Sequence, residues 1–128
     1  MSNDHQRDII NIIIDRYCQV WNESDLSRKA TLLASVWAED ATYTDPTVHT
    51  TGANELLSHI AKVQDKRPGA RVIRTTNIDM HHGVARFNWQ IIEADGSARP
   101  EGLDLVFLSP NNEKIDRIIG FFGPLSPV

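Results

Sequence analysis

The sequence predicts an α+β fold in which helices pack against one face of an antiparallel sheet. The first half of the 128 residues carries apolar side chains at helical spacing. The second half alternates apolar and polar residues and is divided by turn signals, which is typical of strands joined by hairpins. A chain of this length fits one domain, so we expect residues 1–128 to form a single unit.

Three helices are expected in the first half. The first, over residues 4–21, has an apolar stripe made of Ile10, Ile13, Ile14, Tyr17 and Trp21. Ser24 or Asp25 can cap a second helix that runs through Val36. Thr51 can cap a third helix, which Arg67-Pro68-Gly69 ends.

Five strands are expected, one before the third helix and four after it. Residues 41–44 read as a short strand, which Asp45-Pro46 stops because the residue before a proline is restricted. The later strands are expected within residues 71–80, 85–91, 98–108 and 115–122. His82-Gly83, Asp95-Gly96 and Pro110–Asn112 are the turns between them.

Composition excludes several classes of protein. The hydrophobic fraction of 41% and the charged fraction of 23% are those of an ordinary globular domain. A net charge of -4 does not fit a protein that binds nucleic acid. The single cysteine, Cys18, cannot form an intramolecular disulfide, and no zinc-ligand spacing is present. With no apolar run long enough to span a bilayer and no signal-like start, we expect a cytoplasmic protein without membrane association.

Four short motifs together resemble a known family. They are Arg16-Tyr17 followed by Trp21-Asn22 and Asp25, the segment 38–46, Leu103-Asp104, and the segment 120–123. Their order along nearly the whole chain is similar to the nuclear transport factor 2-like fold, also called the SnoaL-like or ketosteroid isomerase-like family. The resemblance implies three helices packed on a strongly curved antiparallel or mixed sheet, which forms a cystatin-like cone with an internal cavity.

The resemblance also implies catalytic roles. In the steroid isomerases of this family, an aspartate after the first strand moves the proton, while a tyrosine and a protonated aspartate donate hydrogen bonds to the oxyanion. The matching positions are Asp45 as base, with Tyr17 and Asp104 as donors. This chemistry needs no cofactor. Ile60 stands where those isomerases have a second, supporting tyrosine, and Trp37 with segment 121–124 looks closer to the SnoaL-like group, which includes polyketide cyclases.

The residues themselves leave alternatives open. Asp104 lies in an apolar strand, where a carboxyl group is costly unless it is protonated or paired, for example with Arg86 or Arg117. Asp45 before Pro46 either only starts a turn or serves as a base, and alternation puts Tyr43 on the same face as Asp45. Tyr17 is either an ordinary buried tyrosine or an oxyanion donor.

Seven further residues are expected to contact a substrate, although each fits an ordinary core equally well: Trp21, Trp37, His59, Ile60, Phe87, Trp89 and Phe122. His81 and His82 are neighbours in an extended segment and point to opposite faces, so they cannot chelate one metal ion. We therefore expect no metal site.

The leading hypothesis is an isomerase or cyclase that removes a proton next to the carbonyl group of a small apolar, polyketide-like or steroid-like molecule. An epoxide-hydrolase type of enzyme is an alternative, favoured if Arg86 or Arg99 lies between the two aspartates. The other alternative is a binding or assembly module without turnover. Because residues 103–108 and 115–122 are apolar on both faces, we also expect a homodimer.

Overall fold

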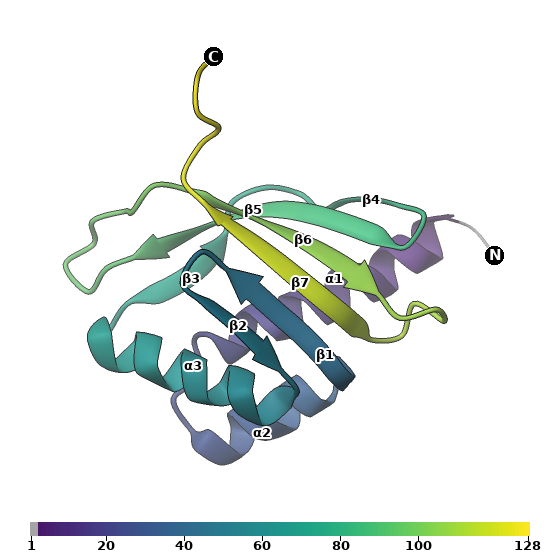
Figure 1. Ribbon diagram of the computed structural model, residues 1–128, viewed down its shortest axis with the longest axis horizontal. Helices are drawn as coiled ribbons and strands as arrows, with labels where there is room; N and C mark the ends of the chain where they lie inside the picture. The colour runs from purple at the N-terminus through teal and green to yellow at the C-terminus, as the bar shows by residue number, and fades with distance from the viewer. Residues whose placement is uncertain (1–2) are drawn as a thin grey trace.

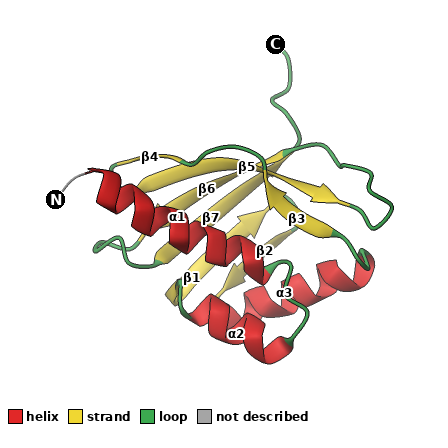
Figure 2. Cartoon of the chain, turned by 180° about the vertical axis from the view of Figure 1, so that it is seen from behind, coloured by secondary structure: helices red, strands yellow, loops and turns green. Residues whose placement is uncertain are grey.

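The computed structural model describes residues 3–128 and confirms the α+β class. Helices α1 (Asn3–Val20), α2 (Leu26–Ala34) and α3 (Ala53–Lys66) all lie on one side of the sheet (Figures 1 and 2). No helix in this part of the chain is long and apolar enough to cross a membrane. The three expected helices are thus present, close to their predicted bounds.

The sheet has seven strands and is mixed. The strands are β1 (Trp37–Asp45), β2 (Val48–Thr51), β3 (Arg71–Arg74), β4 (Asp79–His81), β5 (Val84–Ile92), β6 (Gly102–Leu108) and β7 (Ile115–Phe122). Their order is β2-β1-β7-β6-β5-β3, with β4 also paired to β5. Strands β1 and β7 run parallel and the other neighbours antiparallel, which confirms the mixed sheet that the resemblance implied.

Irregularities in two strands accompany the curvature of the sheet. The register between β1 and β7 shifts between Trp37 and Thr42, and Asp40 within this stretch has a φ of 62°. A second shift separates Phe107 from Leu108 on β6. Extra residues of this kind bend a strand and increase its twist. The bent sheet wraps around α1, and the space between them is where the site lies.

Two features of the sheet differ from the expected strands: residues 71–80 form two strands, β3 and β4, instead of one, and β2 was not expected. The chain was expected to enter the third helix after Pro46, but it first folds back and pairs with β1 from Asp45↔Val48 to Thr42↔Thr51. The turn is closed by the Asp45 carboxylate, which accepts hydrogen bonds from the next residues. Thr51 therefore belongs to a strand, and Gly52 is the N-cap of α3.

Strand β6 is shorter than expected and β1 is longer. Residues 98–101 pair with β5 only through one bridge, Ile92↔Ala98, and regular pairing begins at Gly102. Pro100 has no N–H to donate, which explains why the ladder does not extend through it. At the other strand, β1 reaches back to Trp37 because it continues beside β7 across the register shift.

Side chains fix the loop between α1 and α2. Asp25 accepts a hydrogen bond of 2.9 Å from the backbone N–H of Arg28, so Asp25, not Ser24, caps α2. The amide of Asn22 donates to the carbonyl of Val72 at 2.8 Å and accepts from its N–H at 2.7 Å. This pair of bonds ties the loop to β3 and holds the end of α1 against the sheet.

The core confirms the predicted stripe of α1. Ile10, Ile13, Ile14 and Tyr17 are buried, and the ring of Tyr17 stacks on Trp37 with centroids 6.0 Å apart. Strand β5 likewise buries the Ala85 side of its alternation and exposes Arg86. The same apolar face that makes the core continues into the lining of the site.

Candidate active site

Two carboxylates come together across neighbouring strands of the sheet. Asp45 ends β1, Asp104 lies in the middle of β6, and β7 runs between them. A Cβ placed on Gly120 of β7 would lie 2.9 Å from Oδ1 of Asp104 and 3.6 Å from Cβ of Asp45. Gly120 therefore leaves the space through which the two acidic residues face each other.

Both acids line one cavity of about 500 Å³. This volume lies within the range of small-molecule sites, roughly 300–1,000 Å³. Its aromatic lining comes from α1, β1, β5 and β7: Tyr17, Trp21, Tyr43, Phe87, Trp89 and Phe122. Basic residues complete part of the wall: Lys66, Arg67 and Arg99.

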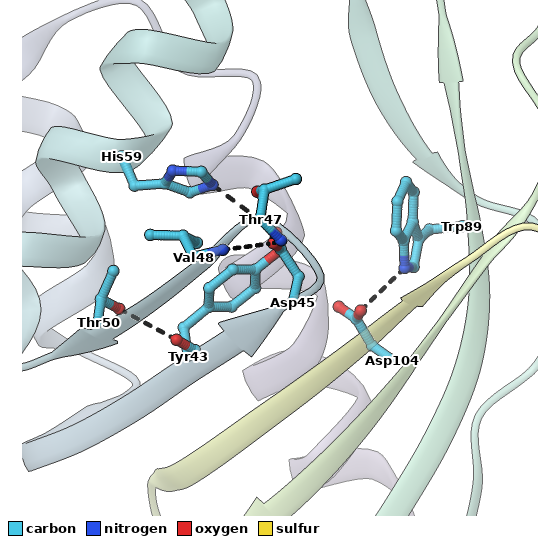
Figure 3. Close-up of polar contacts among 8 residues, drawn as sticks. All are labelled: Tyr43, Asp45, Thr47, Val48, Thr50, His59, Trp89 and Asp104. Atoms are coloured by element: carbon cyan, nitrogen blue, oxygen red, sulfur yellow. Dashed lines mark hydrogen bonds and ion pairs between the residues drawn. The ribbon is translucent and has the colours of Figure 1, made fainter.

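Asp45 is held rigidly and is almost fully buried, with its side chain 3% exposed. Its Oδ1 accepts hydrogen bonds from the N–H and hydroxyl of Thr47, both at 2.7 Å, and from the N–H of Val48 at 3.1 Å. Its Oδ2 accepts one bond, from the Tyr43 hydroxyl at 2.7 Å (Figure 3). The turn residues thus bond to Oδ1, and Oδ2 remains available to accept a proton.

Three aromatic side chains lie around Oδ2 of Asp45. Nε2 of His59 lies 3.8 Å from it, and the rings of Trp21 and Tyr43 pack against His59 with centroids about 6 Å apart. Burial lowers the pKa of His59, and Lys62 and Lys66 lower it further, although Asp45 opposes them. His59 is therefore held in its neutral form beside the carboxylate at neutral pH.

Asp104 is the buried acid of the site, 5% exposed. Burial raises its pKa to about 7, and the charge of Asp45 adds to the rise, while a hydrogen bond from Trp89 opposes it. That bond runs from Nε1 of Trp89 to Oδ1 at 2.9 Å (Figure 3). Near neutral pH the group is therefore divided between its acid and carboxylate forms, which suits proton transfer.

Gly102 positions the indole of Trp89. The two residues are direct partners on β6 and β5, and a Cβ on Gly102 would lie only 2.3 Å from the Trp89 ring. The ring therefore lies across the bare backbone of β6, where its N–H reaches Asp104 and its edge meets Phe122. The sequence analysis gave Gly102 no role, because nothing in the sequence shows which strand residue faces it.

Tyr17 presents a buried hydroxyl to the same cavity. No hydrogen-bond partner for it occurs among the residues described. Burial raises the pKa of Tyr17 well above its usual value, and the charge of Asp104 adds to this rise, whereas the nearby indole of Trp21 opposes it. The phenol is therefore neutral and has a proton available to donate.

Five of the seven expected substrate contacts line the cavity: Trp21, His59, Phe87, Trp89 and Phe122. Trp37 and Ile60 do not, which corrects their assignment. Both are buried in the core, where Trp37 stacks behind Tyr17 and Ile60 points inward from α3. The periodicity of the sequence marks both as apolar, but it does not distinguish the side of the core that opens on a cavity.

The structure also removes some alternatives. Neither arginine pairs with Asp104, because Arg86 is exposed and bonds to Asp79, while Arg117 lies over the ring of Phe107. The residue between the two aspartates is Gly120, so the arginine that would have favoured the epoxide-hydrolase alternative is not found there. The expectation that His81 and His82 point to opposite faces is wrong, because His82 has a φ of 49° at the turn and the Nδ1 atoms of the two rings lie 3.2 Å apart.

Tyr43 is the principal site residue that the sequence analysis did not name as functional. Strand alternation puts its side chain beside Asp45, and that signal was available, but the hydrogen bond between them depends on the unpredicted turn. Cys18 also lines the cavity, and burial raises the pKa of its thiol to about 12, so it remains an unreactive thiol.

Taken together, the cavity offers a carboxylate, a carboxylic acid and a neutral phenol around an apolar space. Such a set can remove a proton from carbon and stabilise the negative charge that develops on a neighbouring oxygen. The fold and the cavity together define an α+β protein with an internal site of small-molecule size.

Comparison with solved structures identifies the family. A SnoaL-like family protein from Agrobacterium tumefaciens strain C58, provisionally described as an isomerase, is 31% identical, with a TM-score of 0.84. The match covers 91% of this chain and 99% of that one. The chain belongs to the SnoaL-like family.

More distant structures share the fold. A protein with a cystatin-like fold from Methylobium petroleophilum PM1 is 16% identical, with a TM-score of 0.75 over 94% of this chain and 80% of that one. A protein with a ketosteroid isomerase-like fold from Catenulispora acidiphila, solved with trimethylamine, is 14% identical, with a TM-score of 0.68 over 87% and 85%. No protein-family model and no curated protein matches the sequence.

Proposed function

We propose that this protein catalyses proton transfer at the carbon next to a carbonyl group, as an isomerase or cyclase of a small apolar molecule. One observation carries the proposal: two buried carboxyl groups flank Gly120 in one cavity, Asp45 held by its hydrogen bonds to the Thr47 turn and Asp104 with a pKa that burial raises to about 7. Two acidic groups with different surroundings can take opposite roles, one as base and one as acid.

In this mechanism Asp45 is the base and uses Oδ2. The three hydrogen bonds to its other oxygen fix the carboxylate, so it does not reorient during the reaction. Tyr43 and His59 are positioning residues for that oxygen. The proton moves from the substrate carbon to Oδ2, and the electron pair of the broken C–H bond passes to the carbonyl oxygen as an enolate.

Tyr17 and protonated Asp104 stabilise that enolate. The Trp89 N–H bonds to Oδ1 of Asp104, which leaves Oδ2 to carry the proton and donate it as a hydrogen bond. The unpartnered Tyr17 hydroxyl is the second donor. Removal of one oxyanion donor typically lowers kcat by about 10²–10³-fold. Asp45 then returns the proton to another carbon, or the enolate attacks a second carbonyl within the same molecule and the resulting alkoxide takes up the proton from Asp45.

A protein that binds a ligand without turnover is the second candidate. The open cavity is consistent with it, whereas a purely structural role is disfavoured, since Trp37 and Trp89 do not fill the space. A protonated carboxyl group can also donate a hydrogen bond to a bound neutral ligand, so turnover is the property that distinguishes the two candidates.

The test is proton exchange, which requires no knowledge of the product. Bicyclic ketones such as 2-tetralone are incubated in D₂O with the protein, and loss of the protons next to the carbonyl is followed by ¹H NMR. We expect saturable exchange above the buffer rate, reduced about 10²–10⁴-fold in Asp45→Asn. The asparagine keeps an oxygen for the turn, and Asp65→Asn, on the exposed side of α3, is the matched control. Full exchange by Asp45→Asn would exclude Asp45 as the base.

A further inference from the structure

Three basic residues gather on the wall of the cavity, although the chain as a whole has a net charge of -4. Lys66 and Arg67 end α3, and Arg99 lies in the connection between β5 and β6. Figures 1 and 2 both show this end of α3 and this connection on the same side of the molecule. The mechanism described above uses none of these three side chains.

One of the three has a structural partner. Arg67 forms an ion pair with Glu93, which ties the end of α3 to the end of β5. Neither Lys66 nor Arg99 has an acidic partner among the residues described. Lys66 interacts favourably with the C-terminal dipole of its helix, which would account for a lysine at that position. Arg99 is not on a helix, so the dipole does not explain it.

The backbone holds Arg99 in place while its side chain is left without a partner. Its N–H donates to the carbonyl of Ile91 at 2.9 Å, and its own carbonyl accepts from the amide of Gln90 at 2.8 Å. Pro100 follows and restricts Arg99 to extended conformations. A loop residue anchored on both sides thus presents a guanidinium to the cavity.

Lys66 lies further along α3 than His59, the residue of this helix that faces Asp45. His59 of α3 lies against Asp45, and Lys66 follows seven residues later, which is about 10 Å further along the helix axis. A molecule that fills the cavity can therefore contact the basic residues as well as Asp45 and Asp104. Lys66, Arg67 and Arg99 carry three positive charges, and Asp45 and Glu93 carry two negative charges. When Asp104 is protonated, this group of side chains therefore has one excess positive charge.

We propose that the substrate is a carboxylate-bearing carbonyl compound, whose carboxylate is bound by Lys66 and Arg99 on the wall of the same cavity. One carboxylate balances the excess charge, and a guanidinium is well suited to bind it. The inference rests on the proposed function, since it names the substrate class of the same cavity. Its test involves no turnover, so the two can fail separately.

The probes are 4-(2-naphthyl)butanoate and the corresponding primary amide, which match in shape and differ in charge. Their dissociation constants are measured by calorimetry at neutral pH and low salt. We expect the carboxylate to bind about tenfold more tightly than the amide. The double substitution Lys66→Gln and Arg99→Gln should abolish this preference and leave the affinity for the amide unchanged.

Lys62→Gln is the matched control, because Lys62 is an exposed lysine of the same helix that does not line the cavity. It should keep the full preference, and added salt should reduce the preference in both the wild-type protein and this variant. Equal affinity for the two probes in the wild-type protein would overturn the proposal. So would a preference that survives the double substitution, or no binding of the carboxylate at millimolar concentration.

Discussion

At the scale of single residues, the buried carboxyl group of Asp104 is the feature on which the proposed function most depends. When an acid at a core position ionises, the folded protein loses stability, which does not happen with leucine at the same position. Burial raises the pKa of Asp104 to about 7, so this cost appears at neutral pH. A stability cost of this kind is common where residues are needed for chemistry.

The pH dependence of unfolding tests this directly. The folded protein keeps a proton on Asp104 up to about pH 7, while the unfolded chain loses it near 3.8, so stability falls as pH rises through this window. Three pKa units correspond to at most about 4 kcal/mol. Asp104→Asn does not ionise and its amide oxygen can still accept from Trp89. We expect its Tm advantage over the wild-type protein to grow by on the order of 10 °C between pH 4 and pH 8.

Asp116→Asn serves as the control for this experiment. Asp116 is an exposed residue of β7, so its substitution should leave the pH dependence of the wild-type protein unchanged. Parallel stability curves for Asp104→Asn and the wild-type protein would mean that Asp104 ionises as it does in water.

The sequence alone was sufficient to single out Asp104, because an acid flanked by Leu103 and Leu105 contradicts the apolar pattern of its strand. It was not sufficient for Arg99 or Tyr43. Alternation placed Tyr43 beside Asp45 but did not show the hydrogen bond between them, and the place of Arg99 in the cavity lining depends on contacts with β5 that the local pattern does not record. Residues that conflict with their own element are therefore easier to predict as functional than residues that agree with it.

At the scale of elements, strands β5 and β6 position the acid through one missing side chain. Gly102 allows the Trp89 ring to lie across β6, and the Trp89 N–H lowers the pKa of Asp104 relative to burial alone. Trp89→Phe removes the N–H but keeps a ring over the glycine. We expect it to raise the pKa of Asp104 above about 7, as measured by ¹³C NMR titration of the carboxyl carbon.

Gly102→Ala should raise the same pKa by displacing the ring, and should also cost about 1–3 kcal/mol of stability through steric conflict. Trp89→Phe is its matched comparison, since it breaks the same hydrogen bond without adding an atom to β6. If the pKa of Asp104 stays the same in both variants, the hydrogen bond to the indole does not influence the acid.

Helix α2 offers a prediction on local structure alone. Asp25 accepts the hydrogen bond from the N–H of Arg28, whereas the neighbouring Ser24 makes no such contact in the described structure. Asp25→Ala should lower the free energy of unfolding in urea by about 1 kcal/mol, and Ser24→Ala by less than about 0.5 kcal/mol. Equal losses would show that both residues share the cap.

Sequence patterns predicted the helices and most strands of this fold because each has a long apolar period or a clear turn signal. Strand β2 escaped because its four residues alternate weakly and its turn depends on the Asp45 side chain. The start of β6 was predicted too early because residues 98–101 have the sequence pattern of a strand. In the structure they pair with β5 through a single bridge and not through a regular ladder. Strand pairing depends on both partner strands, so the sequence of one strand predicts it only in part.

At the scale of the whole molecule, the helices cover one face of the sheet and leave the other without cover (Figures 1 and 2). On β6 and β7 that face is apolar, in directly paired positions: Leu103 with Phe121, and Leu105 with Ile119. Phe121 is 53% exposed. A contiguous apolar face of this kind commonly forms a contact between protein chains.

We expect this face to pack against the same face of a second copy of the chain. In such a symmetric dimer, both copies bury the same residues. Light scattering at micromolar concentration should give twice the chain mass of 14.4 kDa. Leu105→Glu, in the middle of the face, should give the mass of one chain, since it would bury a charge on each side of the interface. Ile12→Glu is the control: Ile12 is 52% exposed on α1, away from the sheet face, so this variant should remain a dimer. A wild-type protein that scatters as a single chain would contradict the prediction, and the apolar face would then need a different partner.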